Sequence, residues 1–389
     1  MSSNFDVIII GGGLFGSFTG LFLARSGKRV ALLERGLVGA QSSGANFGGL
    51  RLQGRSPEQY PLSLMAQGHW ENFDGLIGEG CEYDRNGMVY FASSEASRDR
   101  LLKYASSSRA CGLEIEIWEG DEVRRQLPWL TGSGLTASYS PRCAVANPRI
   151  TTPAVVRAMT RAGGQLFEGT EVVGIDQGQT SFTVSTPNRP PMTAPVLVNA
   201  AGGWAGTICE QFGEPVPLFS AGPPQFVTEP MPYVLKPSVY AIEGDMIIRQ
   251  TSRGNFIFAG YPRTLANDDG RHTFVPPQKT LNGMRAVGTH VPGFRNAEVI
   301  RVWSGVEGYL PDMLPAIGAS QTTAGLYHAF GGSGGGFQIA PAVGECLALE
   351  ICGKKAPVDL SPYSIGRFRS SVEASDKLMR EFDPASSSR

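Results

Sequence analysis

Residues 7–16 read VIIIGGGLFG, and this stretch decides the fold of the chain. Four apolar residues enter a glycine turn, and a helix-like stretch follows it. A second apolar run, Val30–Leu33, ends at Glu34. A strand, a glycine turn, a helix, a second strand and an acid in this order are the layout of a dinucleotide-binding βαβ unit.

Each residue of this unit has a physical reason to be there. Gly11 permits the tight turn, and Gly16 lets the helix pack closely on the strand. Gly13 has no Cβ, so the backbone can approach a pyrophosphate. The helix N-terminus presents free N–H groups and partial positive charge to the phosphates. Glu34 can accept hydrogen bonds from both ribose hydroxyls of an adenosine. The pattern therefore predicts a bound adenine dinucleotide.

The same residues admit another interpretation. Val7–Ala24 carries no charged residue and is long enough for a signal peptide or a membrane span. Asp6 is the nearest charge, no basic region precedes the stretch, and its glycines would weaken a helix in lipid. We therefore expect neither a leader nor a membrane span.

Composition narrows the function classes. A chain of 389 residues with 41% apolar and 18% charged residues is typical of a globular enzyme with two sizeable domains. A net charge of −1 gives no reason to expect nucleic acid as a partner. The six cysteines form no CxxC pair and do not cluster with histidine, so we expect no metal site in this chain. Scattered thiols favour a reducing cytoplasm.

Two later segments repeat the strand-to-glycine-turn pattern, at 195–204 and at 325–336, the second followed by a helix from Ala340. Three such units predict one nucleotide-binding sheet built from distant segments. Residues 216–300 instead contain alternating strands, including a hairpin of 246–250 and 255–259. A further strand is expected at 169–175.

These patterns predict an α/β fold with two domains. A Rossmann-like domain that binds the dinucleotide would combine the discontinuous segments 1–80, 145–215 and 296–375. An α+β substrate domain with a mainly antiparallel sheet would combine 81–144 and 216–295. Residues 376–389 are expected to form a C-terminal tail.

Four segments together resemble the FAD-dependent oxidoreductases of the D-amino acid oxidase superfamily, which includes glycine oxidase and sarcosine oxidase. They are the N-terminal fingerprint, 39–46, 198–204 and 331–344. Three further stretches look most like one subgroup, the flavin β-subunits of opine (octopine or nopaline) oxidases and of D-hydroxyproline dehydrogenases. These stretches are 46–55, 227–230 and 303–309.

The resemblance implies a set of FAD contacts along the chain. The ADP half would be held by Gly11, Gly13, Leu14, Phe15, Gly16, Glu34 and Arg35. The pyrophosphate and the flavin would be lined by Ser42, Ser43, Asn46, Phe47, Gly48 and Gly49. The adenine would meet Val172, the ribityl chain would meet Ala201, Gly202 and Trp204, and the pyrimidine end of the flavin would meet Gly332, Ser333, Gly334, Gly335, Gly336, Phe337 and Gln338. No cysteine lies near Gly305, where some relatives attach the flavin covalently, so FAD is expected to be non-covalent.

The chain departs from the resembled family at the substrate. Glycine oxidase-like members carry a carboxylate-binding arginine where this chain has Glu307. The substrate carboxylate then needs another anchor, for which Arg51, Arg55 and Arg249 are candidates, although each could equally be a surface or phosphate-binding residue. Glu307 could pair with a cationic side arm or a hydroxyl of the substrate, or could be a structural acid that caps a turn.

Two tyrosines, Tyr261 and Tyr309, are candidate substrate contacts, although a buried aromatic side chain is more often part of the core. The chemistry that the resemblance implies is oxidation of the C–N bond of an amino acid or secondary amine, with hydride transfer to flavin N5. The protein must orient the Cα–H bond and bind the neutral amine.

The electron acceptor is left open by the sequence. No lysine occurs between Lys236 and Lys279, the interval that carries oxygen-activating lysines in sarcosine oxidase-like enzymes, which favours a dehydrogenase. The subgroup resemblance implies a second flavoprotein subunit, a small iron–sulfur subunit and FMN at a subunit interface. The alternative is a stand-alone glycine, sarcosine or D-amino acid oxidase. An NAD-linked dehydrogenase and an RNA-modifying flavoprotein are disfavoured, because the later glycine turns and the missing basic surface fit neither.

Overall fold

The computed structural model describes residues 3–132, 135–260, 263–266 and 271–382. Its central sheet has six strands in the order β22-β23-β13-β2-β3-β9. They span Ala316–Ala319, Leu326–Phe330, Val196–Asn199, Val7–Ile10, Val30–Leu33 and Gln165–Phe167, respectively. All neighbours are parallel except β22 and β23. Every residue of β2 and β3 is buried, as expected for parallel strands covered on both faces.

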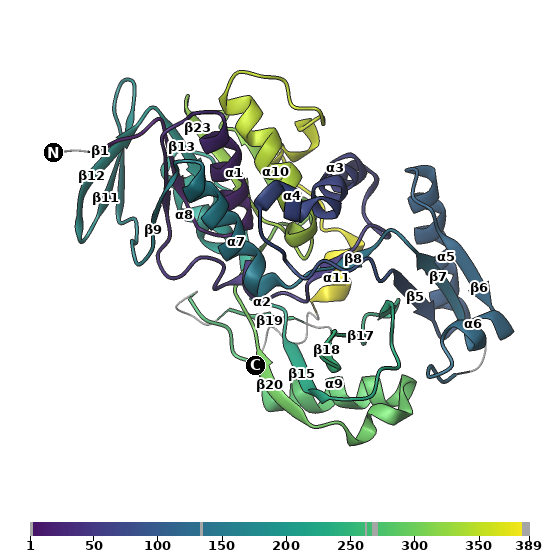
Figure 1. The fold of residues 1–389 in the computed structure, drawn as a ribbon. Helices are drawn as coiled ribbons and strands as arrows, with labels where there is room; N and C mark the ends of the chain where they lie inside the picture. Colours follow the sequence, from purple (N-terminus) through teal and green to yellow (C-terminus); the bar gives the residue numbers. More distant parts are fainter. Residues whose placement is uncertain (1–2, 133–134, 261–262, 267–270, 383–389) are drawn as a thin grey trace.

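Two different layers cover this sheet (Figure 1). On one face lie the helices α1 (Leu14–Arg25), α3 (Tyr60–Glu71), α7 (Pro148–Arg161) and α10 (Gly336–Ile351), whose apolar side chains form one core with Ile9 and Val198. On the other face, Ile8 packs against a small sheet of order β1-β12-β11-β10. Its strands span Ser3–Asn4, Arg189–Ala194, Phe182–Thr186 and Gly174–Gln177.

A second large sheet has eight strands in the order β20-β15-β18-β17-β16-β5-β7-β6. They span Val299–Trp303, Gln225–Pro230, Asn255–Ala259, Ile247–Gln250, Ser238–Ala241, Met88–Ala92, Thr136–Ser140 and Glu116–Glu119. Only the β16–β5 pair is parallel. Helices α6 (Asp121–Gln126) and α9 (Pro277–His290) pack on one side through a core that contains Phe226 and Phe258, and α5 (Glu95–Ala110) packs beside Met88 and Tyr90.

Short elements connect the two parts. Strands β4 (Gly49–Leu50) and β8 (Ala144–Val145) pair with each other, and β14 (Phe219–Gly222) pairs with both β19 (Thr264–Leu265) and β21 (Glu307–Tyr309). Helices α2 (Ser42–Ala45), α4 (Phe73–Ile77) and α8 (Ala205–Gln211) are brief. Helix α11 (Asp376–Glu381), yellow in Figure 1, lies between the two large sheets.

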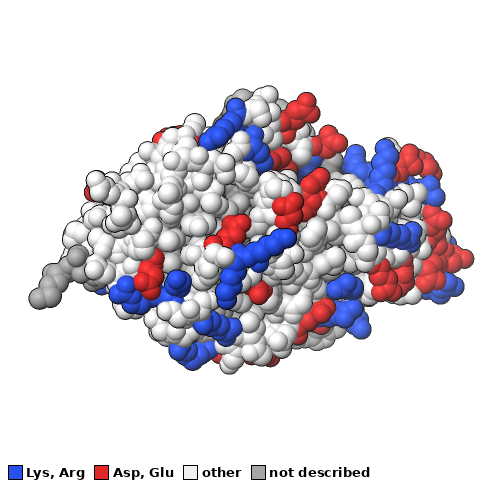
Figure 2. Space-filling view, turned by 90° about the horizontal axis from the view of Figure 1, so that it is seen from above, with Lys and Arg blue, Asp and Glu red and all other residues white. Residues whose placement is uncertain are grey.

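The surface charges and the helix lengths concern the expectations about nucleic acid and about a membrane span. Figure 2 shows Lys and Arg intermingled with Asp and Glu on one face, with both signs gathered at the end that carries α5 and β6. Among the described helices, none combines the length and the apolar character that a bilayer crossing requires.

The predicted α/β architecture is confirmed: the three strand-to-glycine-turn segments lie side by side as β23, β13 and β2. The hairpin also forms, as β17 and β18. Two expectations are wrong. Residues 168–173 form no strand, and β10 begins at Gly174. Strand β20 lies in the segment assigned to the dinucleotide-binding domain. It nevertheless pairs with β15 in the second sheet, with Val227 opposite Arg301.

Candidate active site

The first glycine turn joins β2 to α1. Gly11 has a φ of +112°, and a Cβ there would lie 2.2 Å from the Ala200 carbonyl oxygen. A Cβ on Gly16 would lie 2.1 Å from the Gly11 carbonyl oxygen. The two glycines therefore bring the turn, α1 and the end of β13 into direct contact, which no side chain at either position would allow.

The acid at the end of β3 is tied to this turn. One oxygen of Glu34 accepts a hydrogen bond from the Gly12 N–H at 2.8 Å, and the other accepts from the Gly36 N–H at 2.7 Å. The carboxylate thus lies beside the N-terminus of α1. A carboxylate oxygen has two lone pairs, so Glu34 retains the capacity to accept ribose hydroxyls as well.

The segment around α2 forms the next wall. Ser43 Oγ accepts from the Leu14 N–H at 2.9 Å. The Asn46 amide donates to the carbonyls of Ser42 and Ser43 and accepts from the Gly48 N–H. These bonds hold a short loop against the start of α1, where helix N–H groups and small side chains meet.

Two of the predicted FAD contacts, Arg35 and Trp204, form a cation–π pair. The Arg35 guanidinium lies 4.5 Å from the centre of the Trp204 ring. Trp204 Nε1 is buried and has no hydrogen-bond partner among the described residues. A buried donor without a partner costs free energy, and this donor lies outside the cavity lining.

The third glycine turn, 331–336, lies directly before α10. Positive φ angles at Gly331, Ser333 and Gly334 curl this turn before α10 begins at Gly336. Ser333 Oγ accepts from the Leu310 N–H at 3.1 Å and donates to the Gly331 carbonyl. Successive backbone N–H groups in such a turn form a concave site for an anion or a carbonyl oxygen.

One elongated cavity connects these parts. It is lined by fifteen of the predicted FAD contacts, namely Gly13, Leu14, Phe15, Ser42, Ser43, Asn46, Phe47, Gly49, Gly202, Gly332, Gly334, Gly335, Gly336, Phe337 and Gln338. The other predicted contacts, Gly11, Gly16, Glu34, Arg35, Gly48, Val172, Ala201, Trp204 and Ser333, do not line it. The glycines and backbone amides of the three turns fit FAD. No cysteine or histidine is among the described residues that line the cavity, which fits non-covalent binding.

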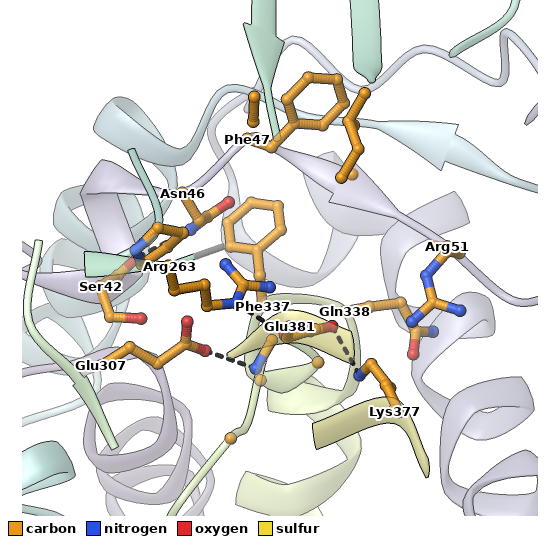
Figure 3. A pocket seen from close by; sticks show the side chains of 18 of the residues that line it. Ser42, Asn46, Phe47, Arg51, Arg263, Glu307, Phe337, Gln338, Lys377 and Glu381 are labelled. Atoms are coloured by element: carbon orange, nitrogen blue, oxygen red, sulfur yellow. Dashed lines mark hydrogen bonds and ion pairs between the residues drawn. The ribbon is translucent and has the colours of Figure 1, made fainter. Parts of the chain in front are cut away.

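The far part of the cavity is different in kind, because four cationic side chains line it: Arg51, Arg55, Arg263 and Lys377. Figure 3 shows Arg263, Glu307, Glu381 and Lys377 around one region, with dashed lines for their ion pair and hydrogen bonds. Three tyrosines, Tyr90, Tyr104 and Tyr240, line the same part. Their rings contact one another edge to face, with the centres of Tyr90 and Tyr240 5.5 Å apart.

Two arginines come from the segment after β4. Arg51 Nη1 donates to the carbonyls of Gln53 and Gly54 at 2.7 and 2.9 Å. Arg55 Nε donates to the Arg51 carbonyl, and burial together with the nearby Arg51 charge lowers the pKa of Arg55 to about 9. Both guanidinium groups are still cationic at neutral pH, so this wall of the cavity is positive.

Other candidate residues lie outside the cavity lining. Arg249 is buried, donates to the Phe47 carbonyl at 2.8 Å and lies over the Phe47 ring. Since it does not line the cavity, its placement supports a role in holding the 46–49 loop and not the expected role as carboxylate anchor. Tyr309 is buried behind the cavity wall. Tyr261 lies outside the described residues.

Glu307 lines the cavity, but both of its oxygens are engaged. One accepts from the Gly334 N–H and the other from the Tyr309 hydroxyl, each at 2.7 Å. The carboxylate therefore fixes the third glycine turn to β21. This arrangement supports the structural role that the sequence left open.

Three further charged residues line the cavity, and no sequence pattern indicates them: Arg263, Lys377 and Glu381. Arg263 Nε lies 2.7 Å from a Glu381 oxygen, and Lys377 Nζ donates to the Ser333 carbonyl at 3.3 Å. Lys377 and Glu381 belong to α11, in the segment expected to be a tail. The cavity therefore contains a lysine, Lys377, although the interval between Lys236 and Lys279 has none. No local pattern signals this, because α11 reaches the cavity only through tertiary packing.

Burial lowers the pKa of Lys377 to about 7, although the neighbouring Glu381 carboxylate opposes this shift. Arg51, Arg55 and Arg263 reinforce the lowering through charge repulsion. The Lys377 side chain is 27% exposed, and it lines the cavity. An amine with this pKa is present in both protonation states at neutral pH.

Comparison with known proteins identifies the family. The family model described as FAD dependent oxidoreductase, or DAO, matches residues 6–349. Glycine oxidase from Geobacillus kaustophilus is 27% identical over 94% of this chain and 98% of its own length. Its crystal structure superposes with a TM-score of 0.88, covering 94% of this chain and 99% of that one at 25% identity. The sarcosine oxidase subunit beta of Rhizobium meliloti is 24% identical over 94% of this chain and 88% of its own.

Proposed function

This chain belongs to the DAO family of FAD-dependent oxidoreductases, and from this premise we propose that it oxidises the C–N bond of an amine that carries a carboxylate. The observation that carries the proposal is the set of cations in the cavity: Arg263 and Lys377 lie beside Gly334, Arg55 lies beside Gly335, and Arg51 lines the same cavity. Glu307 and Glu381 also line it, and each is engaged by a partner within the protein. Cationic side chains in a concave site favour an anionic substrate. Similarity to glycine oxidase over nearly the whole of both chains supports the same class.

FAD, when bound, supplies the acceptor for the hydride that leaves the substrate carbon. The residues of this chain bind and orient the substrate. Arg263 holds the substrate carboxylate through paired N–H donors, and Tyr90, Tyr104 and Tyr240 wall the cavity and exclude water. As the C–H bond breaks, the nitrogen lone pair forms the C=N bond. Water then hydrolyses the iminium to a carbonyl compound and an amine, unless the product is a stable cyclic imine.

Before this oxidation, the substrate amine must lose its extra proton. Lys377 is positioned to take it, because its Nζ lines the cavity and burial brings its pKa to about 7. The neutral form of Lys377 accepts the proton, and the charged form remains beside the bound carboxylate. This role requires only a base whose pKa lies near the working pH.

The finer proposal concerns substrate and assembly. We propose an opine, D-hydroxyproline or similar secondary amine as substrate, and a role as the catalytic subunit of a cytoplasmic multi-subunit dehydrogenase. Similarity to a sarcosine oxidase subunit beta supports the subunit role. The partners would be a second flavoprotein and a small iron–sulfur protein, with FMN at an interface, since the described residues gather no candidate metal ligands. All six cysteines are free thiols, as a reducing compartment favours.

One observation favours the alternative of a stand-alone oxidase that uses oxygen. Lys377 places an amine beside the third glycine turn, where its positive charge would stabilise the superoxide formed as oxygen takes an electron. The sequence argument for a dehydrogenase relied on the absence of such a lysine from one interval. The acceptor therefore has to be measured.

A reduction screen tests the proposal. The purified protein is loaded with FAD and mixed without oxygen with opines, D-hydroxyproline, sarcosine and D-amino acids. Loss of absorbance near ~450 nm identifies the substrate, because oxidised flavin absorbs there and reduced flavin does not. The reduced protein is then exposed either to oxygen or to an artificial dye acceptor. Reoxidation by dye alone supports the dehydrogenase, rapid reoxidation by oxygen supports the oxidase, and a flavin that no carboxylate-bearing amine reduces refutes both.

A further inference from the structure

Three ionic groups meet directly over the third glycine turn. A Cβ built on Gly334 would lie 3.1 Å from Arg263 Nη2, 3.8 Å from a Glu381 oxygen and 3.9 Å from Lys377 Nζ. The Glu381 side chain is only 1% exposed, and its carboxylate lies on Arg263. The anion position that faces this turn is thus filled by a carboxylate of the chain itself.

The occupant has the functional groups of an amino acid. Helix α11 presents the Glu381 carboxylate and the Lys377 amine 3.7 Å apart in the same cavity. A substrate amino acid or opine carries the same two groups. Arg263 has one guanidinium, and the Glu381 carboxylate is paired with its Nε. A substrate carboxylate can bind the Nε edge of Arg263 only if Glu381 moves away.

Helix α11 is short and follows an irregular segment. It spans six residues, Asp376–Glu381, and a helix of this length is not stable without tertiary contacts. The segment 370–375 before it has no regular structure. Its contacts include backbone bonds from Ser375 N–H to the Pro311 carbonyl and from Arg263 N–H to the Glu381 carbonyl. Phe382 packs against Phe219 and Tyr309, and Leu378 packs beside them. The Glu381 and Lys377 side chains bind Arg263 and the Ser333 carbonyl, so these polar contacts hold the helix closed.

We propose that α11 is a displaceable gate, in which Glu381 occupies the Arg263 site as an internal competitor until the substrate carboxylate replaces it. This inference rests on the proposed function, because it assigns the same anion site to the substrate. The apparent affinity for a carboxylate is then the intrinsic affinity multiplied by the fraction of molecules in which α11 is open. Weakening the Glu381–Arg263 pair raises that fraction.

The test uses the FAD-loaded full chain and pyrrole-2-carboxylate as a carboxylate probe. Binding of the probe is measured by the change in the flavin absorbance spectrum. Glu381→Gln should lower the apparent Kd for the probe at least tenfold, and Glu381→Asp, which keeps the charge on a shorter side chain, should lower it less. Glu373→Gln is the matched control, because it removes an exposed carboxylate from the same segment.

In the wild-type protein, saturating probe should speed hydrogen exchange at amides 376–382.

Two results would overturn the gate. The first is a Kd for Glu381→Gln that equals or exceeds the wild-type value; the second is slower exchange of α11 when the probe is bound, which would mean that the helix closes over the ligand. The reduction screen is run in parallel on wild-type protein. If amino carboxylates reduce the flavin while Glu381→Gln leaves the Kd unchanged, the gate alone fails. If wild-type protein neither binds the probe nor is reduced by any amino carboxylate, the proposed function fails with it.

Discussion

The two ends of the cavity are built from different materials. The cofactor end consists mainly of glycines, backbone amides and helix N-termini from three strand-to-turn segments. The substrate end consists of charged and aromatic side chains from segments that are far apart in the sequence, among them Arg51, Arg263 and Lys377. A backbone site is fixed by local turn geometry, whereas a side-chain site depends on how distant elements pack.

This difference predicts different responses to mutation. A change at the cofactor end should disturb folding and FAD retention together, because the same glycines make the turn and the packing contact. A change at the substrate end should spare FAD and alter substrate kinetics.

The largest effect is expected for Gly11→Ala. The new Cβ would meet the Ala200 carbonyl oxygen at 2.2 Å in a backbone conformation that disfavours side chains. We expect a loss of roughly 3 kcal/mol or more in the free energy of unfolding and a protein purified without flavin. Thermal unfolding and the flavin-to-protein absorbance ratio measure both.

Gly27→Ala is the control for that substitution. Gly27 also has a positive φ, +80°, but a Cβ there meets nothing within 4 Å. We expect a cost of about 1 kcal/mol and normal FAD content. A Gly11→Ala protein that keeps stoichiometric flavin would contradict the role assigned to this turn.

The second effect belongs to the substrate end. Arg263→Ala should lower kcat/KM for the amine found in the reduction screen by about 100-fold or more, because the carboxylate loses a buried charged partner. FAD content should not change. Arg253→Ala, which removes an arginine with a 68% exposed side chain from the β17–β18 turn, should leave kcat/KM near the wild-type value. Equal losses in the two variants would rule out Arg263 as the anchor.

Glu307 lies where the two ends meet, and its substitution should act on the cofactor. Glu307→Gln weakens the bond to the Gly334 N–H, so we expect the Kd for FAD to rise about tenfold while the substrate KM changes less than about threefold. Tyr309→Phe removes only the other partner and should have a smaller effect. A large rise in KM with unchanged FAD affinity would instead support contact between Glu307 and a cationic substrate arm.

The smallest effect is a pH dependence of stability. The pKa of Lys377 falls from 10.5 to about 7 on burial, despite the Glu381 carboxylate, with Arg51, Arg55 and Arg263 nearby. Between these values the unfolded chain binds more protons, so the free energy of unfolding should rise with pH. We expect about 1 kcal/mol over this interval, because solvent in the cavity screens the charge.

Urea unfolding of the FAD-loaded protein at several pH values measures this slope. Lys377→Met should remove it, and Lys354→Met, at an exposed position, should not. A wild-type slope that survives in Lys377→Met would assign the pH dependence to another group.

The contrast also explains what the sequence could predict. The strand, turn and acid at 7–34 and the turn at 331–336 have local signatures, so the central sheet followed from them. The FAD contacts that line the cavity were instead implied by the family resemblance. The substrate end has no such signature. Arg249 lies in a predicted strand of the correct sheet, but only tertiary packing decides that it points to Phe47, and only tertiary packing brings Lys377 to the cavity.

The most direct test of the account is a matched pair of amines. The substrate identified by flavin reduction is compared, without oxygen, with the same molecule lacking its carboxylate. We predict that the FAD-loaded protein is reduced by the carboxylate-bearing amine and at least ~100-fold more slowly by its decarboxylated analogue, since a buried charge contact of this kind is worth several kcal/mol. Equal rates for the two amines, or a protein that binds no FAD, would contradict it.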